Sequence, residues 1–371
     1  MALDDLLAEM VALDGTDLFL AVGHAPVVNA HGRWVEVGGG VALDAPALTA
    51  LVRAALPPDD FARFSAEGDA DAAYAVPGGD RFRVNAFRQR GEPGLVLRRL
   101  RSRIPTLEEL GAPPVLGALA QLPRGLVLVT GATGTGKSTT LAAMLALRNA
   151  TQPGHIVTLE DPIEFVHPHG KSLVSQRDVG LDTASFATGI KHALRQAPSV
   201  LLVGEIRDAE TAEAALHVSE TGHLVLATLH STNANQALKR LVNLFPATAE
   251  RSVLHHLSLE LKAIVSQRLL PRADGQGRVA AFEVLLGTPR AADLVREGRI
   301  EELKEAMTQA ASEGASTFDD AVYRLFRAGT VTADAAIAAA DSATDMRTRM
   351  KLDAGVVPSS GPAPRIRITS S

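Results

Sequence analysis

The first hundred residues combine both apolar periods that mark regular secondary structure. Apolar residues recur at helical spacing over residues 3–10 and predict an opening amphipathic helix. A second helical stretch starts near Pro46, and a hairpin is expected to turn near His31 and Gly32. Strands are predicted at 16–22, 27–37, 71–76, 81–89 and 95–101. These elements indicate a small α/β domain with an antiparallel sheet over residues 1–101.

The pattern changes beyond the proline-rich segment 102–113, which we interpret as a linker. Continuous apolar runs now alternate with longer helical patterns, as in a parallel sheet covered on both faces. The runs are 125–131, 155–160, 200–205 and 223–229. From about residue 251 the chain reads as mostly helical. Two short helices are expected in 316–341, with Gly329 as a stop and Thr332 as an N-cap. The second domain is therefore predicted at 114–354.

Composition narrows the class of protein. The chain has 371 residues, enough for two domains, and is 46% hydrophobic. Its net charge of −5 and pI near 6.1 argue against a dedicated nucleic-acid binder. The absence of cysteine excludes disulfides and cysteine-based zinc sites. The amino terminus lacks the pattern of a signal peptide, and no apolar run is long enough to span a membrane. The segment 355–371, rich in Gly, Pro and Ser, is predicted to be disordered.

The segment "GATGTGKS" at 131–138 fits the phosphate-binding pattern G-x-x-x-x-G-K-[ST] in full. It follows an apolar strand and precedes a helical run, which is the context that the motif requires. Glycines let backbone N–H groups curl around phosphate oxygens, and the helix N-terminus favours an anion. Lys137 is expected to reach the β- and γ-phosphates, and the Ser138 hydroxyl to ligate Mg²⁺.

Carboxylates and histidines end the other apolar runs. Glu160 ends one strand, where it can position the attacking water or simply belong to a solvated Asp-Pro turn. Glu205 ends a strand expected beside the phosphate loop, where it acts on the nucleotide or merely pairs with Arg207. His223 and His230 flank the strand 223–229; such histidines are more often structural, and the pair alone makes no metal site.

Four sequence motifs follow one another along the chain: "GATGTGKS", "LEDPIEF", "LLVGEIRD" and "TGHLVLATLHSTNA". Together they resemble the Walker A, Asp box, Walker B and His box of the secretion-type ATPases that drive type IV pili and type II secretion. That family typically has Gly before the Walker B Glu, so Gly204 matches it. "RFRVNAF" at 81–87 resembles the family's N-terminal domain. The resemblance implies an α/β protein, with a PAS-like N-terminal domain and a RecA-like P-loop NTPase domain.

Within that superfamily the chain resembles the PilT/PilU family of type IV pilus retraction ATPases. The tetracysteine zinc motif of the extension and type II secretion ATPases is impossible here. Several stretches look most like the PilU group, among them "VGLDTASF" and "NANQALKRLVNLFP". The PilT group carries a helix reading A-I-R-N-L-I-R-E; this chain has "RAADLVRE", with Ala292 and Asp293 in place of Arg and Asn. The departure favours an accessory motor that assists a main retraction ATPase.

The resemblance also implies a mechanism. A homo-hexamer would bind ATP between subunits, with Mg²⁺ held by Ser138 and by Glu205 through water. Glu160 would activate water, Glu205 could share the base role, and His230 would sense the γ-phosphate with His223 nearby. Arginines from a neighbouring subunit would neutralise transition-state charge. Their candidates are Arg81, Arg83 and Arg98. The nucleotide would be held by Gly131, Ala132, Thr133, Gly134, Thr135, Gly136, Lys137, Ser138 and Thr139.

The expected setting is the cytoplasmic side of the inner membrane, where the ring would act on a platform protein of the pilus machine and stay peripheral to the bilayer. Three alternatives stand beside this interpretation. One is a PilT-type primary retraction ATPase, and another is a RecA-like nucleic-acid motor. The third is a non-catalytic scaffold that joins mixed rings, against which the intact Glu160 and Glu205 argue.

Overall fold

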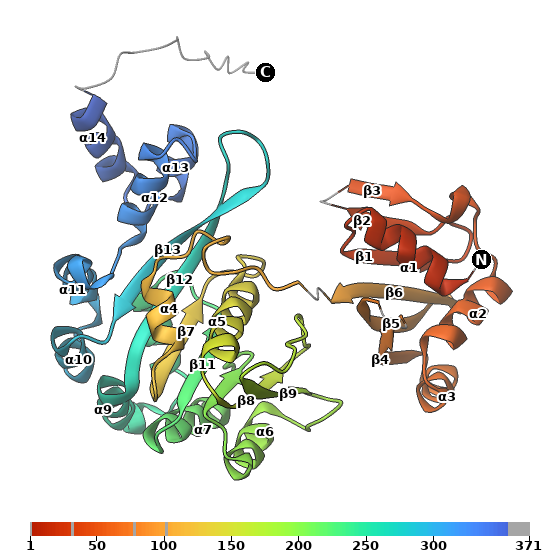
Figure 1. Ribbon diagram of the computed structural model, residues 1–371, viewed down its shortest axis with the longest axis horizontal. Helices are drawn as coiled ribbons and strands as arrows, with labels where there is room; N and C mark the ends of the chain where they lie inside the picture. Colours follow the sequence, from red (N-terminus) through yellow and green to blue (C-terminus); the bar gives the residue numbers. More distant parts are fainter. Residues whose placement is uncertain (1, 31–32, 77–78, 101–102, 355–371) are drawn as a thin grey trace. The chain divides into compact units, whose positions relative to one another are not determined.

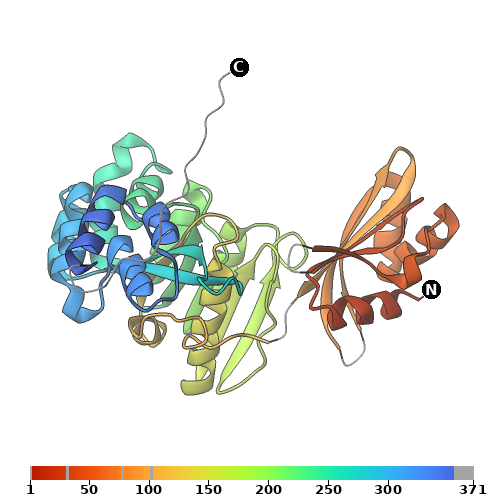
Figure 2. The ribbon, with the colours of Figure 1, turned by 90° about the horizontal axis from the view of Figure 1, so that it is seen from above.

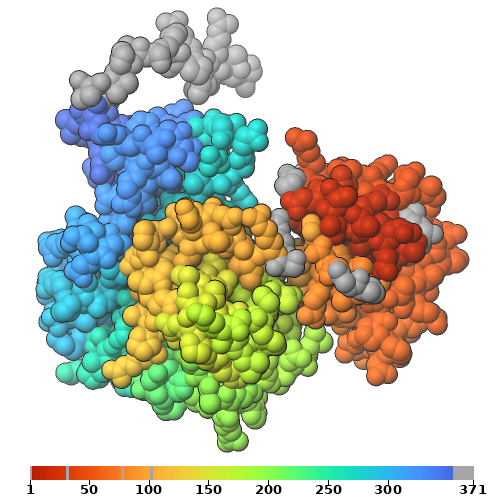
Figure 3. Space-filling model, viewed as in Figure 1, coloured from red at the N-terminus to blue at the C-terminus, as the bar shows by residue number. Residues whose placement is uncertain are grey.

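The computed structural model describes residues 2–30, 33–76, 79–100 and 103–354. The chain divides into two compact units (Figures 1 and 3). The first is Met1–Ile104 together with Pro162–Pro168, and the second is Pro105–Asp161 together with the chain from His169 onward. The hairpin turn expected at His31–Gly32 and the predicted tail 355–371 lie outside the described residues.

The N-terminal unit is an antiparallel sheet in the order β3-β2-β1-β6-β5-β4, with three helices. In Figure 2 these helices lie on one side of the sheet. The strands are β1 (Asp17–Ala21), β2 (Val27–Ala30), β3 (Arg33–Glu36), β4 (Asp69–Ala75), β5 (Arg81–Gln89) and β6 (Glu92–Leu100). The helices are α1 (Leu3–Ala12), α2 (Ala45–Ala55) and α3 (Pro58–Glu67). The PAS-like α/β domain predicted from the sequence is confirmed.

Alternation along the strands decides which face of this sheet carries the helices. Phe82 and Val84 of β5 are fully buried, together with Leu97 of β6, and they belong to the same apolar cluster as the buried side of α1. Leu6 and Met10 supply that side at the helical spacing seen in the sequence. The residues between them on each strand therefore point to the opposite face.

The second unit is built on a seven-stranded sheet in the order β13-β12-β7-β11-β10-β8-β9. All neighbours are parallel except β13, which pairs antiparallel with β12. The strands are β7 (Gly125–Thr130), β8 (Gly154–Glu160), β9 (Ser172–Asp178), β10 (Val200–Val203), β11 (Leu224–Leu229), β12 (Leu261–Pro271) and β13 (Arg278–Leu286). The predicted parallel sheet is confirmed.

Helices cover both faces of this sheet and form two apolar layers (Figure 1). One layer contains α4 and α5, and the other contains α6 to α11. The α-helices are α4 (Val115–Ala120), α5 (Lys137–Thr151), α6 (Phe186–Ala193), α7 (Ala209–Glu220), α8 (Ala234–Val242), α9 (Glu250–Glu260), α10 (Pro289–Arg296), α11 (Leu303–Gln309), α12 (Phe318–Arg327), α13 (Ala333–Ala339) and α14 (Ala343–Ala354). Short 3₁₀ turns occur at Gly38–Gly40, Leu194–Gln196, Ala247–Ala249, Ile300–Glu302 and Ala311–Glu313.

The chain after residue 251 contains the helices α9 to α14, as predicted, but the expectation of helix is wrong at residues 261–286. β12 and β13 form a long hairpin that joins the edge of the sheet beside β7. β12 is buried on both faces over most of its length, so it lacks the alternation that marks a half-exposed strand. The two helices expected in 316–341 are present as α12 and α13. Thr332 caps α13 by accepting a hydrogen bond from Ala335 N, and Gly329 follows α12 with φ 68°, as predicted.

Candidate nucleotide site

The phosphate-binding segment forms a tight loop between β7 and α5. Gly131 and Gly136 have φ angles of 152° and 91°, which favour glycine. A Cβ on Gly131 would lie 2.5 Å from Thr135 Oγ1 and 2.7 Å from the Gln267 carbonyl oxygen. The loop therefore leaves no space for a side chain at its first position. Gln267, which sequence reasoning missed, also accepts a hydrogen bond from Thr140 Oγ1 at 2.9 Å and so ties β12 to α5.

The residues of this loop fit a bound anion. Lys137 is buried and its Nζ donates to the carbonyl oxygens of Gly131 and Ala132, each at 3.0 Å. Its ammonium group thus lies over the centre of the loop. The fifteen-residue helix α5 starts without a side-chain cap, so the amides of its first turn face the loop as donors. Ser138 and Thr139 occupy that first turn and are half-buried.

Four neighbouring parallel strands present their carboxyl ends at one edge of the sheet. The order is β7, β11, β10, β8, so the phosphate loop is followed across the sheet by the ends that carry His230, Glu205 and Glu160. The expectation that the strand of Glu205 lies directly beside that of the phosphate loop is wrong, because β11 lies between them. Carboxyl ends of parallel strands are where open α/β sheets bind ligands.

Gly204 brings the ends of β8 and β10 together. Its amide donates to the Leu159 carbonyl oxygen at 2.7 Å. A Cβ on Gly204 would lie 3.0 Å from that oxygen and 3.2 Å from the Glu160 Cα. Glycine is therefore favoured by the close approach of the two backbones and not by a special φ angle. Its absence of a side chain lets the two carboxylates of Glu160 and Glu205 stand on adjacent strand ends.

The Glu205 carboxylate is buried, at 7% exposure, and has two basic partners. His230 Nε2 lies 3.1 Å from Glu205 Oε2, and the guanidinium of Arg207, itself largely exposed, forms an ion pair with Oε1. The backbone behind Glu205 is held by Thr228, whose hydroxyl donates to the Gly204 carbonyl at 2.5 Å. Glu205 thus pairs with Arg207 and at the same time contacts His230 of the His box. The ion pair with Arg207 therefore does not exclude a role of Glu205 at the nucleotide.

The Glu160 carboxylate is oriented by two donors. Thr158 Oγ1 donates to Glu160 Oε1 at 2.6 Å, and Gln176 Nε2 donates to the same oxygen at 3.0 Å. Gln176 lies on β9, a strand that the sequence analysis did not predict. The in-register pairing of β8 with β9 places Gln176 opposite Thr158, which explains how both reach one oxygen.

His223 lies at the other end of its strand. It precedes β11, and its carbonyl oxygen accepts from Gly125 N, where β7 begins. Its ring contacts Thr221 Oγ1 and the Val218 carbonyl oxygen. His230 follows the same strand at its carboxyl end, about 20 Å away for an extended segment of this length. The expectation that His223 lies near His230 is wrong within one chain.

The three arginine candidates lie on one face of the N-terminal sheet. Arg83 and Arg98 are direct cross-strand partners on β5 and β6, and Arg81 is two residues from Arg83 on the same side. Asp17 Oδ1 lies 2.7 Å from Arg98 Nε, and Asp71 lies 3.9 Å from Arg83. Because like charges opposite one another are unfavourable, these carboxylates stabilise the arginine cluster. The face is the one opposite the helices.

Two oxygen donors at this edge of the sheet fit a metal ion that is bound together with a nucleotide. Among the residues that the structure describes, no three His, Asp or Glu side chains form a group that could hold a metal ion. The donors at hand are the Ser138 hydroxyl at the start of α5 and the buried carboxylate of Glu205. Hard oxygen ligands of this kind suit Mg²⁺ bound together with phosphate oxygens.

The chain matches known proteins over most of its length. Residues 74–335 match the family model of type II/IV secretion system proteins. The chain is 47% identical to the type IV pilus ATPase PilU of Pseudomonas aeruginosa, over 95% of this chain and 92% of that protein. It is 41% identical to the retraction ATPase PilT of the same organism, over 89% and 96%. The crystal structure of the pilus retraction motor PilT with bound ADP superposes with a TM-score of 0.88, 37% identity and coverage of 94% and 99%. No helix in the described part of the chain is both long and apolar enough to cross a bilayer.

Proposed function

The chain belongs to the type II/IV secretion system protein family, within its type IV pilus retraction ATPases, and from this we propose that it is an accessory retraction motor of the PilU type. It is an ATPase that acts in pilus retraction and twitching motility, and it binds a nucleotide. The observation that carries the proposal is the edge of the parallel sheet where the phosphate loop, His230, Glu205 and Glu160 are brought to successive strand ends.

The residues at this edge have complementary parts in the proposed reaction. Lys137 and the α5 amides neutralise the phosphates of ATP, and Ser138, with Glu205 through water, would hold Mg²⁺. Mg²⁺ supplies charge neutralisation on the phosphate oxygens. The Glu160 carboxylate, fixed through its Oε1 by Thr158 and Gln176, orients the attacking water and accepts its proton. The ring of His230 reports the γ-phosphate to Glu205 through their shared contact.

The sequence identities to PilU and to PilT favour the accessory role. Identity to PilU is 47% over 95% of the chain, against 41% over 89% for PilT. In α10 the side chain of Asp293 accepts a hydrogen bond from Arg296 Nη2 at 2.5 Å. The negative charge at this position is therefore paired within the same helix. The PilT motif has Arg and Asn at positions 292 and 293, where this chain has Ala and Asp. The surface that α10 offers therefore differs in charge from that of a primary motor.

The motor is proposed to act as a homo-hexamer with ATP between subunits, an arrangement in which a second subunit would bring positive charge to the γ-phosphate. Arg81, Arg83 and Arg98 of a neighbouring subunit supply that charge. The partners proposed for the ring are the main retraction ATPase and the platform protein of the pilus machine. The ring remains in the cytoplasm, peripheral to the inner membrane.

The proposal is tested first with the purified protein. ATP turnover is expected for the wild type and a loss of at least about 100-fold for Lys137→Ala, since the ammonium group is removed from the phosphates. Mass measurement with and without nucleotide tests the hexamer. The accessory role is tested in a strain that lacks both retraction ATPases. Expression of this chain alone is expected not to restore twitching, and full restoration would instead assign it the primary role.

A further inference from the structure

A row of buried polar side chains runs across three adjacent strands behind the phosphate loop. Thr130 is the last residue of β7, Ser266 is its neighbour on β12, and Glu283 is the partner of Ser266 on β13. Their exposures are 0%, 0% and 2%. Thr130 Oγ1 donates to Ser266 Oγ at 3.0 Å, and Ser266 lies directly opposite Glu283 in the antiparallel pairing of β12 with β13.

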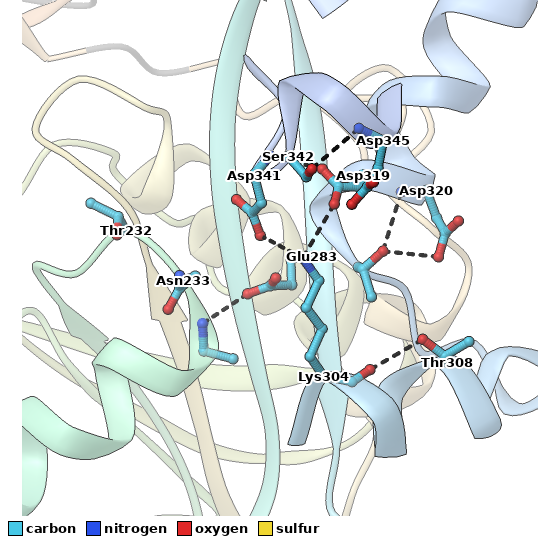
Figure 4. A network of polar contacts seen from close by, with 12 residues as sticks. Thr232, Asn233, Glu283, Lys304, Thr308, Asp319, Asp320, Asp341, Ser342 and Asp345 are labelled. Atoms are coloured by element: carbon cyan, nitrogen blue, oxygen red, sulfur yellow. Dashed lines mark hydrogen bonds and ion pairs between the residues drawn. The ribbon is translucent and has the colours of Figure 1, made fainter. Parts of the chain in front are cut away.

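The row ends at the loop that follows His230. Glu283 Oε1 accepts a hydrogen bond of 2.7 Å from Ala234 N, the first residue of α8 (Figure 4). A buried carboxylate at a helix N-terminus is favoured by the helix dipole and by the amides of the first turn. The bond fixes the carboxyl end of the His230–Asn233 loop to β13. The side chains of Thr130, Ser266 and Glu283 thereby connect the phosphate loop to the His230 loop across three strands.

Arg268 on β12 makes a second contact with the same loop. Arg268, two residues after Ser266 on β12, donates to the carbonyl oxygens of Thr232 at 3.5 Å and Ala339 at 2.7 Å. It also pairs with Asp341 at 2.8 Å and stacks on Phe318 at 3.8 Å. Asp341 in turn contacts Lys304, as does Asp319 (Figure 4). The His230 loop is therefore held by β12 and β13, and Arg268 connects it to the C-terminal helices.

Glu283 is the residue of β13 that connects this polar row to the His230 loop. A buried carboxylate is costly unless it is hydrogen-bonded, so a polar core position is retained where it performs a task. Val284, the next residue of β13, is also fully buried but faces the opposite side of the sheet, among apolar residues. The two residues are neighbours on one strand and both are buried. Glu283 contacts the His230 loop, whereas Val284 packs on the other face of the sheet.

We propose that Glu283 is a positioning residue for ATP hydrolysis, which holds the His230 loop at a fixed place relative to the phosphate loop through Ser266 and Thr130. The inference rests on the proposed function, because it takes His230 and the phosphate loop to act on the same nucleotide. Glu283 itself touches no nucleotide. Its effect is therefore expected on turnover and not on nucleotide affinity.

The experiment compares Glu283→Ala, Glu283→Gln and Ser266→Ala with the wild type and with Val284→Ala as the matched control. ATP turnover, ADP affinity, melting temperature and amide exchange over residues 231–236 are measured in each. Glu283→Ala is expected to lower kcat about tenfold with ADP affinity within about twofold, and to speed exchange at 231–236. Glu283→Gln keeps an acceptor for Ala234 N and should recover most of kcat. Ser266→Ala is expected to lower kcat about threefold, because it cuts the link to Thr130.

The control separates positioning from general weakening of the strand. Val284→Ala is expected to lower the melting temperature and to leave kcat within about twofold of wild type. Equal loss of kcat in Val284→Ala and Glu283→Ala, or wild-type kcat and exchange in Glu283→Ala, would overturn the inference. If Glu283→Ala did not fold, Ser266→Ala would decide by the same two readouts. A wild type without ATP turnover would remove the proposed function; exchange at 231–236 would then decide on Glu283 alone.

Discussion

His230 Nε2 and Glu205 Oε2 lie 3.1 Å apart at the ends of two neighbouring parallel strands, β11 and β10. Glu205 is buried, whereas the His230 side chain is 39% exposed. A buried carboxylate is thus connected to a ring that can reach a ligand at the edge of the sheet. The contact connects the end of β11, the strand next to β7, with the end of β10, which carries Glu205.

Replacing Glu205 by Gln is expected to reduce kcat by at least about 100-fold, because the charge that contacts His230 and that we propose acts on Mg²⁺ is lost while the shape is kept. ADP affinity should change far less, since Lys137 and the α5 amides remain. Steady-state turnover and ADP titration measure the two effects. Wild-type turnover in Glu205→Gln would remove Glu205 from the chemistry. Asp208→Asn, which alters a nearby N-cap carboxylate of α7, serves as the control for nonspecific loss of charge.

Replacing Gly204 by Ala tests the close approach of β8 and β10. The added Cβ would lie 3.0 Å from the Leu159 carbonyl oxygen, so the strand ends must move apart. The free energy of unfolding is expected to fall by about 1–3 kcal/mol, and kcat about tenfold as Glu160 shifts. Chemical denaturation and turnover assays measure both.

The control for that variant is Gly117→Ala in α4. There the nearest atom to an added Cβ is Leu147 Cδ2, at the ordinary contact distance of 3.5 Å. Because alanine is favoured over glycine in a helix, the change should be neutral or stabilise by about 0.5–1 kcal/mol. An equal loss of stability in both variants would show that the backbone approach at Gly204 has no special cost.

The sequence predicted which strand ends carry the candidate site residues, because each of these strands is a continuous apolar run that stops at a polar residue or at the phosphate loop. It could not give their order, since the insertion of β11 between β7 and β10 is a property of the tertiary fold. His223 was grouped with His230 because they flank one strand. A strand of six residues separates its two ends by most of the height of the sheet, so flanking residues of one strand are far apart.

Contacts between distant segments escaped prediction for a related reason. Gln176 reaches Glu160 only because β8 and β9 pair in register, and Glu283 reaches Ala234 only because β13 joins the sheet. β12 and β13 were taken for helix, since strands buried on both faces have no period-two pattern. Single polar residues inside such apolar runs, like Ser266 and Glu283, are the one sequence signal that points to a buried network.

A pH-dependent loss of stability is expected from His167. Burial lowers the pKa of His167 from 6.5 to about 4, so the folded chain holds the ring neutral. Between these values the unfolded chain binds more protons, and stability is present above pH 6.5 and lost as the pH falls toward 4. His167→Phe should remove on the order of 2–3 kcal/mol of that loss. Urea unfolding of both proteins at pH 7 and pH 4.5 measures the difference, and an identical loss in both would contradict it.

The arginine cluster of the N-terminal sheet is expected to act on a neighbouring subunit's nucleotide. Arg83 and Arg98 lie side by side across β5 and β6, and each is paired with a carboxylate that keeps the two charges together. Alanine at either position should lower kcat about 100-fold, while Arg63→Ala on α3, which pairs with Asp60 of the same helix, should leave kcat unchanged. ATP turnover of each purified variant measures the loss.

Mixing two inactive variants distinguishes action in trans from action within one chain. Subunits with Arg98→Ala keep an intact phosphate loop, and subunits with Lys137→Ala keep intact arginines. In an equal, randomly assembled mixture, about a quarter of the sites join an intact loop to an intact neighbouring arginine. Turnover is therefore expected to recover to about that fraction of wild type. If the arginine acted only on its own chain's nucleotide, no pairing of these subunits would rebuild a complete site and the mixture would stay inactive.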